Sequence, residues 1–187
     1  MPVQFDRNTQ SDLLKKIRQS VEQNSTELQL AFSERPLNTV AWLARNLLEL
    51  AIWSEYCTQS EENAKEFVID SARDACDVLD IPDGLLSKES FQPIRQELIA
   101  KARTDGFDIE ENYTRVATAA KKLGRIEFFK HMNKAFSKFA HPTALSIVYN
   151  PNDEETLLRQ KFHDIGMDLS QIAVQFLNTK LIEDRVI

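Results

Sequence analysis

One segment, residues 39–57, limits the fold more than any other part of the sequence. It reads TVAWLARNLLELAIWSEYC, and as a helix it would carry apolar side chains on nearly every side. Apolar surface left in water is unfavourable, so a helix of this kind has to be covered by neighbours all round. The segment therefore predicts a buried central helix with other helices packed around it.

Apolar residues recur at helical spacing through most of the remaining chain, and only four glycines and six prolines interrupt it. The spacing predicts a first helix over about 11–33, and Asn38 is the predicted cap of the second. Ser60 is the predicted cap of a third helix. Further helices are expected over about 90–104, 110–123, 125–140 and 153–183. The expected fold is all-α, a single-domain bundle of six or seven helices over residues 1–187.

Length and composition exclude several classes of protein. The chain has 187 residues, 42% of them apolar, so a sizeable core is expected. Its formal net charge is −6, so no overall attraction to nucleic acid is expected. No apolar run approaches the roughly 20 residues that span a bilayer, and the first residues lack a secretory signal pattern. Two cysteines do not make a disulfide framework. These features predict a cytoplasmic protein without membrane contact, and no motif predicts a metal or a cofactor.

Two charged residues, Arg45 and Glu49, interrupt the apolar helix one turn apart. Residues at this spacing face the same way and can form an ion pair. One interpretation is a structural pair that fixes how neighbouring helices pack, since an unpaired buried charge is costly. Apolar residues can often replace such a pair without loss of stability, so its presence also fits an internal site. Both interpretations stay open.

Positive charge is concentrated in residues 113–141, which carry +6 with neutral histidines against −12 in the rest of the chain. Lys130, Lys134 and Lys138 recur every four residues and share one face, where like charges repel by roughly a few tenths of a kcal/mol per pair. Solvent, acidic side chains of another helix, or an anionic ligand such as a nucleic-acid backbone would each offset this repulsion. The candidate acidic partners are Glu66, Asp70, Asp74 and Asp77.

The other face of this lysine-bearing helix is aromatic and apolar. We expect it to pack in the core rather than to stack on bases, because it lies mostly away from the lysines. Its residues are Phe128, Phe129, Met132, Phe136 and Phe139.

Ser137 and His141 lie one turn apart where the same helix ends before Pro142. A histidine there can bond free backbone carbonyls or approach Glu49. No glycine-rich elbow surrounds Ser137, so the pair does not predict a serine hydrolase. The predicted site gathers Arg45, Glu49, Ser137 and His141 between two helices, with Lys134 and Lys138 at its mouth. In this predicted site, Arg45 binds an anion or holds Glu49 in place, and Glu49 orients His141.

Two segments resemble an uncharacterised family of bacterial all-helical proteins. They read LNTVAWLARNLLELAIWSEYCTQSEENAKEF and MNKAFSKFAHPTALSI. The pattern of that family joins an Arg…Glu helix to a later helix that ends in Ser…His-Pro. Position by position, the resemblance implies Arg45, Glu49, Ser137 and His141 as site residues, without implying a reaction.

The helical layout is also similar, more distantly, to the HEPN superfamily of nucleotide-binding and ribonuclease domains. Those ribonucleases place an arginine and a histidine four to six residues apart, as Arg125 and His131 are, although Ile126 stands where a polar residue is expected. This resemblance implies metal-independent RNA cleavage in a defence or stress setting. His131 or His141 would be the general acid–base, and Arg45 or Arg125 would stabilise the transition state.

Three functions stand as hypotheses. The first is binding of a phosphate-bearing ligand or nucleic acid through the polar cluster and the lysine face. The second is a HEPN-like ribonuclease. The third is a structural module that forms a homodimer or grips a partner, which an exposed stripe with Trp42, Leu47 or Trp53 would favour. The sequence leaves open whether the chain is an enzyme.

Overall fold

The protein is all-helical wherever the computed structural model describes it, which is over residues 5–79, 91–104, 114–141, 143 and 153–183. Seven helices lie in these ranges, so the predicted all-α fold is confirmed. None of them has the length and hydropathy needed to cross a membrane, as far as these residues go. The helices are α1 (Arg7–Glu34), α2 (Leu37–Gln59), α3 (Glu61–Val78), α4 (Gln92–Thr104), α5 (Val116–Lys122), α6 (Ile126–Ala140) and α8 (Asp153–Glu183).

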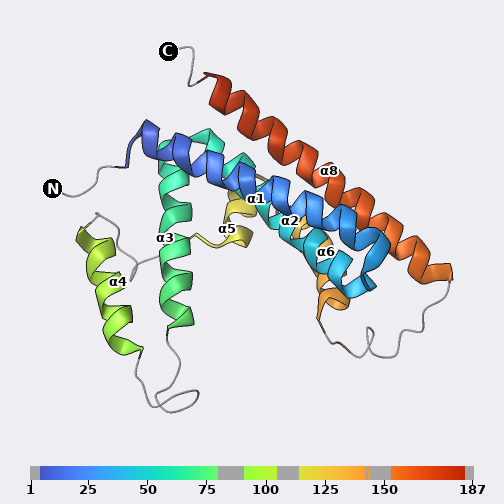
Figure 1. Ribbon diagram of the computed structural model, residues 1–187. Helices are drawn as coiled ribbons and strands as arrows, with labels where there is room; N and C mark the ends of the chain where they lie inside the picture. The colour runs from blue at the N-terminus through green and yellow to red at the C-terminus, as the bar shows by residue number, and fades with distance from the viewer. Residues whose placement is uncertain (1–4, 80–90, 105–113, 142, 144–152, 184–187) are drawn as a thin grey trace.

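Helix α2 lies at the centre of the bundle, as its composition predicts. Thirteen of its 23 residues are buried, so its few polar side chains sit at seams between neighbouring helices. It contacts α1, α3, α5, α6 and α8. Figure 1 shows α1, α2, α6 and α8 packed together, with α3 leaving this group at a steep angle. The main core is therefore built around α2.

Helices α1 and α8 run antiparallel beside α2 (Figure 1). Near one end, the guanidinium of Arg18 donates to the side chain of Asn178 at 2.8 Å. Near the other end, Arg159 donates to the backbone carbonyls of Phe32 and Arg35, which close the last turn of α1. These hydrogen bonds fix the register of α1 against α8.

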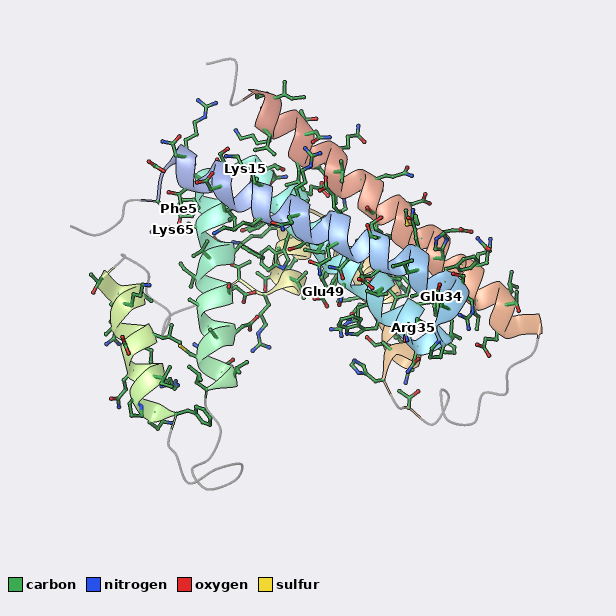
Figure 2. All side chains as sticks on the ribbon, viewed as in Figure 1. Phe5, Lys15, Glu34, Arg35, Glu49 and Lys65 are labelled. Carbon is green, nitrogen blue, oxygen red and sulfur yellow. The ribbon has the colours of Figure 1, made fainter. Side chains whose placement is uncertain are left out.

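Figure 2 locates the two ends of α1. Phe5 and Lys65 lie at the end where α1 begins and α3 leaves the bundle, whereas Glu34 and Arg35 lie at the turn into α2. Only Pro36 and Arg35 separate α1 from α2, so the two helices form a tight antiparallel hairpin.

The start of α2 differs from the prediction. Asn38 does not cap the helix but lies inside its first turn, because α2 already begins at Leu37. The N–H of Thr39 donates to the carbonyl of Pro36 at 3.0 Å, which makes Pro36 the capping position without a side-chain bond. Burial of Leu37 in the core favours this earlier start.

Side-chain caps begin two other helices. The carboxylate of Asp6 accepts from the N–H of Thr9 at 2.9 Å, which explains why α1 begins four residues earlier than the apolar spacing predicts. The predicted cap of α3 is confirmed, since the hydroxyl of Ser60 accepts from the N–H of Asn63 at 3.1 Å.

Helices α3 and α4 form an arm that projects from the main bundle (Figure 1). A second, small core holds them together, with Cys76, Ile99 and Ala102 buried and Ile69 and Ala72 beside them. Both cysteines of the chain, Cys57 and Cys76, are buried and unpaired.

Gly166 marks the closest approach of α8 to the α1–α2 hairpin. A Cβ atom at this position would lie 2.5 Å from Cδ2 of Leu28 and 3.4 Å from Cα of Ala44. Leu28 is fully buried, so an added methyl would force its side chain to shift within the core. The glycine therefore suits the packing here, although it lowers the intrinsic helix propensity of α8.

We expect Gly166→Ala to lower the free energy of unfolding, measured by chemical denaturation. Alanine improves helix propensity by about 1 kcal/mol, but overpacking typically costs about 1–3 kcal/mol. In a Leu28→Ala background the added methyl has room, so the same substitution should become neutral or stabilising. An equal loss of stability in both backgrounds would contradict the packing explanation.

Candidate functional site

Arg45 is the centre of a polar cluster at the seam between α2 and α6. Its NH2 group lies 2.9 Å from Oε1 of Glu49, and its Nε donates to Oδ1 of Asn133 at 2.9 Å. Its NH1 group lies 3.5 Å from Nε2 of His141, a long contact. The structure thus brings together three of the predicted residues, with the guanidinium linking Glu49 on α2 to His141 at the end of α6.

The Arg45 cluster, made of Arg45, Glu49, Asn133 and His141, is open to solvent rather than sealed in the core. The side chains of Arg45 and Glu49 are 28% and 32% exposed. A guanidinium has five N–H donors, and the three contacts use one on each nitrogen. Two N–H donors of Arg45 therefore have no acceptor among the described residues.

His141 meets Arg45 through one ring nitrogen. A guanidinium can only donate, so in this 3.5 Å contact Nε2 of His141 is on the acceptor side. His141 takes extended backbone conformation directly after the last turn of α6. This position lets the exposed ring fold back toward Arg45.

Asn133 is the member of the cluster that the sequence reasoning missed. Asn133, Ser137 and His141 recur every four residues, so Ser137 lies between the two side chains that contact Arg45. Ser137 is half-buried, and no hydrogen bond of its hydroxyl is seen in this part of the chain. A search for polar residues at helical spacing on the core side of α6 would have found Asn133.

Arg125 and His131 lie apart from this cluster. Arg125 forms long contacts of 3.4 Å with both carboxylate oxygens of Glu55 on α2. Nδ1 of His131 donates to the carbonyl of Glu127 at 2.7 Å, which leaves Nε2 facing outward on an exposed side chain. Sixteen steps of about 1.5 Å each separate positions 125 and 141, or about 24 Å of helix, so Arg125 lies well apart from His141.

The lysine face of α6 is exposed, and its expected acidic partners lie elsewhere. Lys130 pairs weakly with Glu127 in its own helix at 3.4 Å. Lys134 and Lys138 have no ion pair or hydrogen bond within the described ranges. The acidic residues of α3 instead face another part of the basic segment, because Glu66 pairs with Lys122. Of the alternatives left open for the lysine face, pairing with the acidic residues of α3 is therefore not seen among the described residues.

Two aromatic expectations need correction. Phe128 was expected in the core with the other aromatic residues of α6 but is 48% exposed. It lies about 100° round the helix from the buried Phe129 and falls outside the face that packs against the core. On α2, Trp53 and Leu47 are buried and Trp42 is 48% exposed, so these three residues form no continuous exposed stripe.

A second polar network, the Glu66 network, joins α2, α3 and α5. The carboxylate of Glu66 accepts from the hydroxyls of Tyr56 and Thr114, each at 2.6 Å, and from Nζ of Lys122 at 2.7 Å. Lys122 also donates to the hydroxyl of Tyr56 at 2.8 Å. The bond to Thr114 holds residues 114–115 outside the helix, so α5 begins at Val116. The predicted start was near residue 110, and residues 105–113 lie outside the described ranges.

The Glu66 network alters the acid–base properties of its members. Burial raises the pKa of Glu66, but hydrogen bonds from Lys122, Thr114 and Tyr56 outweigh it and lower the pKa below the ordinary 4.5. Burial and the bond to Glu66 raise the pKa of Tyr56. Burial also raises the pKa of Cys57, so this thiol stays protonated and unreactive. The properties of the Glu66 network are those of a contact that holds α2, α3 and α5 together, rather than those of a reactive site.

Asp70 lies one turn beyond Glu66 on α3 and has the opposite shift. Burial, with repulsion from Asp74, raises its pKa to about 6, although Arg115 opposes the change. The ionised form of Asp70 is therefore destabilising at neutral pH.

No cluster of three or more His, Cys, Asp or Glu side chains suited to a metal ion occurs in the described part of the chain. The His163–Asp164 doublet has a 3.3 Å contact between Nδ1 and Oδ1. The ring of His163 packs against the ring of Phe32 with centroids 4.5 Å apart, so His163 has a structural role in the contact between α8 and α1.

The sequence matches no known protein-family model, and it has no significant match among curated proteins or solved structures. What this chain does has to be argued from its own residues.

We expect Glu66→Gln to lower the free energy of unfolding at pH 7 by about 1–2 kcal/mol, because it removes charge-assisted hydrogen bonds in a partly exposed network. The folded-state pKa of Glu66 is below its unfolded value, so this stabilisation is complete above about pH 4.5 and is lost as the pH falls. The difference between variant and wild type should therefore shrink in acid. Glu27→Gln, on the exposed side of α1, is the matched control and should change stability little at either pH.

Asp70→Asn should have the opposite effect. The folded-state pKa of about 6 exceeds the ordinary 3.8, so Asp70 reduces stability progressively as the pH rises through 6. The melting temperature of Asp70→Asn should exceed that of wild type at pH 8 and equal it near pH 4. A variant that is less stable than wild type at pH 8 would show that the carboxylate is favourably paired.

Proposed function

We propose that this protein binds a phosphate-bearing ligand, nucleic acid included, at the Arg45 cluster and along the lysine face of α6, in the cytoplasm. The observation that supports this most is the arrangement of Arg45, which is held by three side chains while two of its N–H donors have no acceptor among the residues that the structure describes. A fixed guanidinium with free donors suits the oxygen atoms of a phosphate group.

The charge around the cluster supports the same ligand class. Glu49 balances the charge of Arg45, so attraction for an anion has to come from α6. Lys134 and Lys138 supply it, since both are exposed and unpaired among the described residues. The three lysines span eight residues, or about 12 Å of helix, which favours an extended polyanion over a single phosphate ion.

A HEPN-like ribonuclease is the second candidate. It is favoured by the position of His141, whose Nε2 lies 3.5 Å from the guanidinium of Arg45, so that an acid–base group stands beside a cation that could stabilise a phosphate transition state. In this version Arg45 stabilises the transition state and His141 transfers the proton. His131 bonds to the carbonyl of Glu127 and Arg125 contacts Glu55, so neither belongs to the Arg45 cluster.

Binding is tested by fluorescence anisotropy with a labelled single-stranded RNA and with a labelled nucleotide, over a range of salt concentrations. Lys134→Gln and Lys138→Gln should each weaken RNA binding and reduce the salt slope by about 1. Lys16→Gln, on the exposed side of α1, is the matched control and should leave both unchanged. Equal binding by all three variants, or no binding at low salt, would contradict the proposal.

Cleavage is tested with the same RNA and no added metal. If the second candidate is correct, His141→Ala abolishes cleavage and leaves binding in place, whereas His131→Ala has little effect. Cleavage that persists in both variants would exclude both histidines as the catalytic acid–base.

A further inference from the structure

Trp42 is an exposed tryptophan on the same side of α2 as Arg45 and Glu49. From residue 37 to residue 50, the positions of α2 that reach solvent fall on this one side of the helix, and the others are buried. Trp42 lies one turn before Arg45, and side chains at this spacing are neighbours, with Cβ atoms about 5–6 Å apart. The indole therefore stands beside the guanidinium that suits a phosphate group.

The direction from Arg45 to Trp42 leads toward the C-terminal end of α6. Arg125, at the start of α6, contacts Glu55 of α2. Asn133, about two turns later on α6, contacts Arg45, which comes earlier on α2. The two helices therefore run antiparallel, and Trp42 lies toward the end of α6 that carries the last lysine of the lysine face.

Trp42 is 48% exposed and has no ring contact or hydrogen bond with the residues that the structure describes. The other tryptophan, Trp53, is 7% exposed and makes edge contacts with the rings of Tyr56 and Phe67. Single exposed apolar side chains are common on protein surfaces. Trp42 is distinguished by its neighbour, since two N–H donors of Arg45 have no acceptor in the described ranges.

We propose that Trp42 stacks on an unpaired nucleobase whose phosphate lies at Arg45, an inference that rests on the proposed phosphate site. Nucleobases stack on aromatic side chains, so one nucleotide unit would place its base on the indole and its phosphate on the guanidinium. In a duplex the neighbouring bases cover these faces, so the inference requires an unpaired base. The unit is a free nucleotide or part of a single strand, and the lysine face favours the strand.

The test compares three labelled ligands of equal length by fluorescence anisotropy: single-stranded RNA, an abasic strand with the same phosphates, and double-stranded RNA. A stacked base should make the single strand bind several-fold more tightly than either of the others. Charge alone predicts that the duplex binds best, because it has the highest density of phosphates. An unlabelled mononucleotide that competes as well as the strand would identify a free nucleotide as the ligand, and weaker competition would identify the strand.

Trp42→Ala should weaken binding of the single strand roughly 5- to 150-fold, the range that loss of stacking on one base gives, and leave binding of the abasic strand unchanged. Trp42→Phe should retain most of the affinity, because it keeps an aromatic ring. Phe128→Ala is the matched control, since Phe128 is also 48% exposed but lies about 20 Å of helix before His141. It should bind both strands as wild type does, and circular dichroism should show the same helix content for every variant.

Tryptophan fluorescence gives a second measurement of the same contact. Titration with the unlabelled single strand should quench the emission of wild type and of Trp53→Phe, because Trp42 is present in both. It should not quench the emission of Trp42→Phe, in which only the buried Trp53 remains. The abasic strand should quench none of the three proteins.

Equal affinity of wild type for the single strand and the abasic strand would overturn the stacking inference and leave the phosphate site in place. An equal loss for both strands in Trp42→Ala would also overturn it, because Trp42 would then support the Arg45 cluster rather than touch a base. If neither strand binds at low salt, the proposed function and this inference are both wrong.

Discussion

The burial of α2 is the constraint on which the rest of the structure depends. A helix that is apolar on nearly every side has to be surrounded, and α1, α3, α5, α6 and α8 all contact it. Polar groups on such a helix then need partners from those neighbours. Buried Gln10 donates to the carbonyl of Cys57 at 2.8 Å, and Asn63 donates to that of Tyr56 at 3.1 Å. Arg45 and Glu49 obey the same rule at the seam with α6, which is why a polar cluster forms there.

The basic segment 113–141 divides into two parts with different roles. Its first part neutralises acidic residues of the bundle, through Lys122 with Glu66 and Arg125 with Glu55. Its second part, the lysine face of α6, has no such acidic partner from another helix among the described residues. Net charge by itself does not separate these parts, because the distinction depends on which helices α5 and α6 pack against. The first part supports the fold, and the second is what remains for an anionic ligand.

The sequence predicted the fold class and most helices because both depend on local spacing of apolar residues. Its errors occur where a contact from elsewhere decides a local detail. The cap of α2 moved from Asn38 to Pro36 because Leu37 is buried, and α5 begins late because Thr114 bonds to Glu66. Phe128 is exposed because it falls outside the face of α6 that packs against the core, whereas the adjacent Phe129 lies on that face. In the Arg45 cluster, Arg45, Glu49 and His141 were predictable because they are polar residues in apolar surroundings. Asn133 was harder to predict, because the aromatic residues around it dominate the pattern of α6.

The sequence by itself determined that the chain is helical, that residues 39–57 form its buried centre, and that positive charge is concentrated in one segment. These properties follow from residue type and spacing along one chain. Only the tertiary structure decided that Arg45 contacts Asn133 and His141, and that Arg125 and His131 lie outside this cluster. Such contacts depend on how helices distant in sequence align, and that alignment is fixed by packing details such as the absence of a side chain at Gly166.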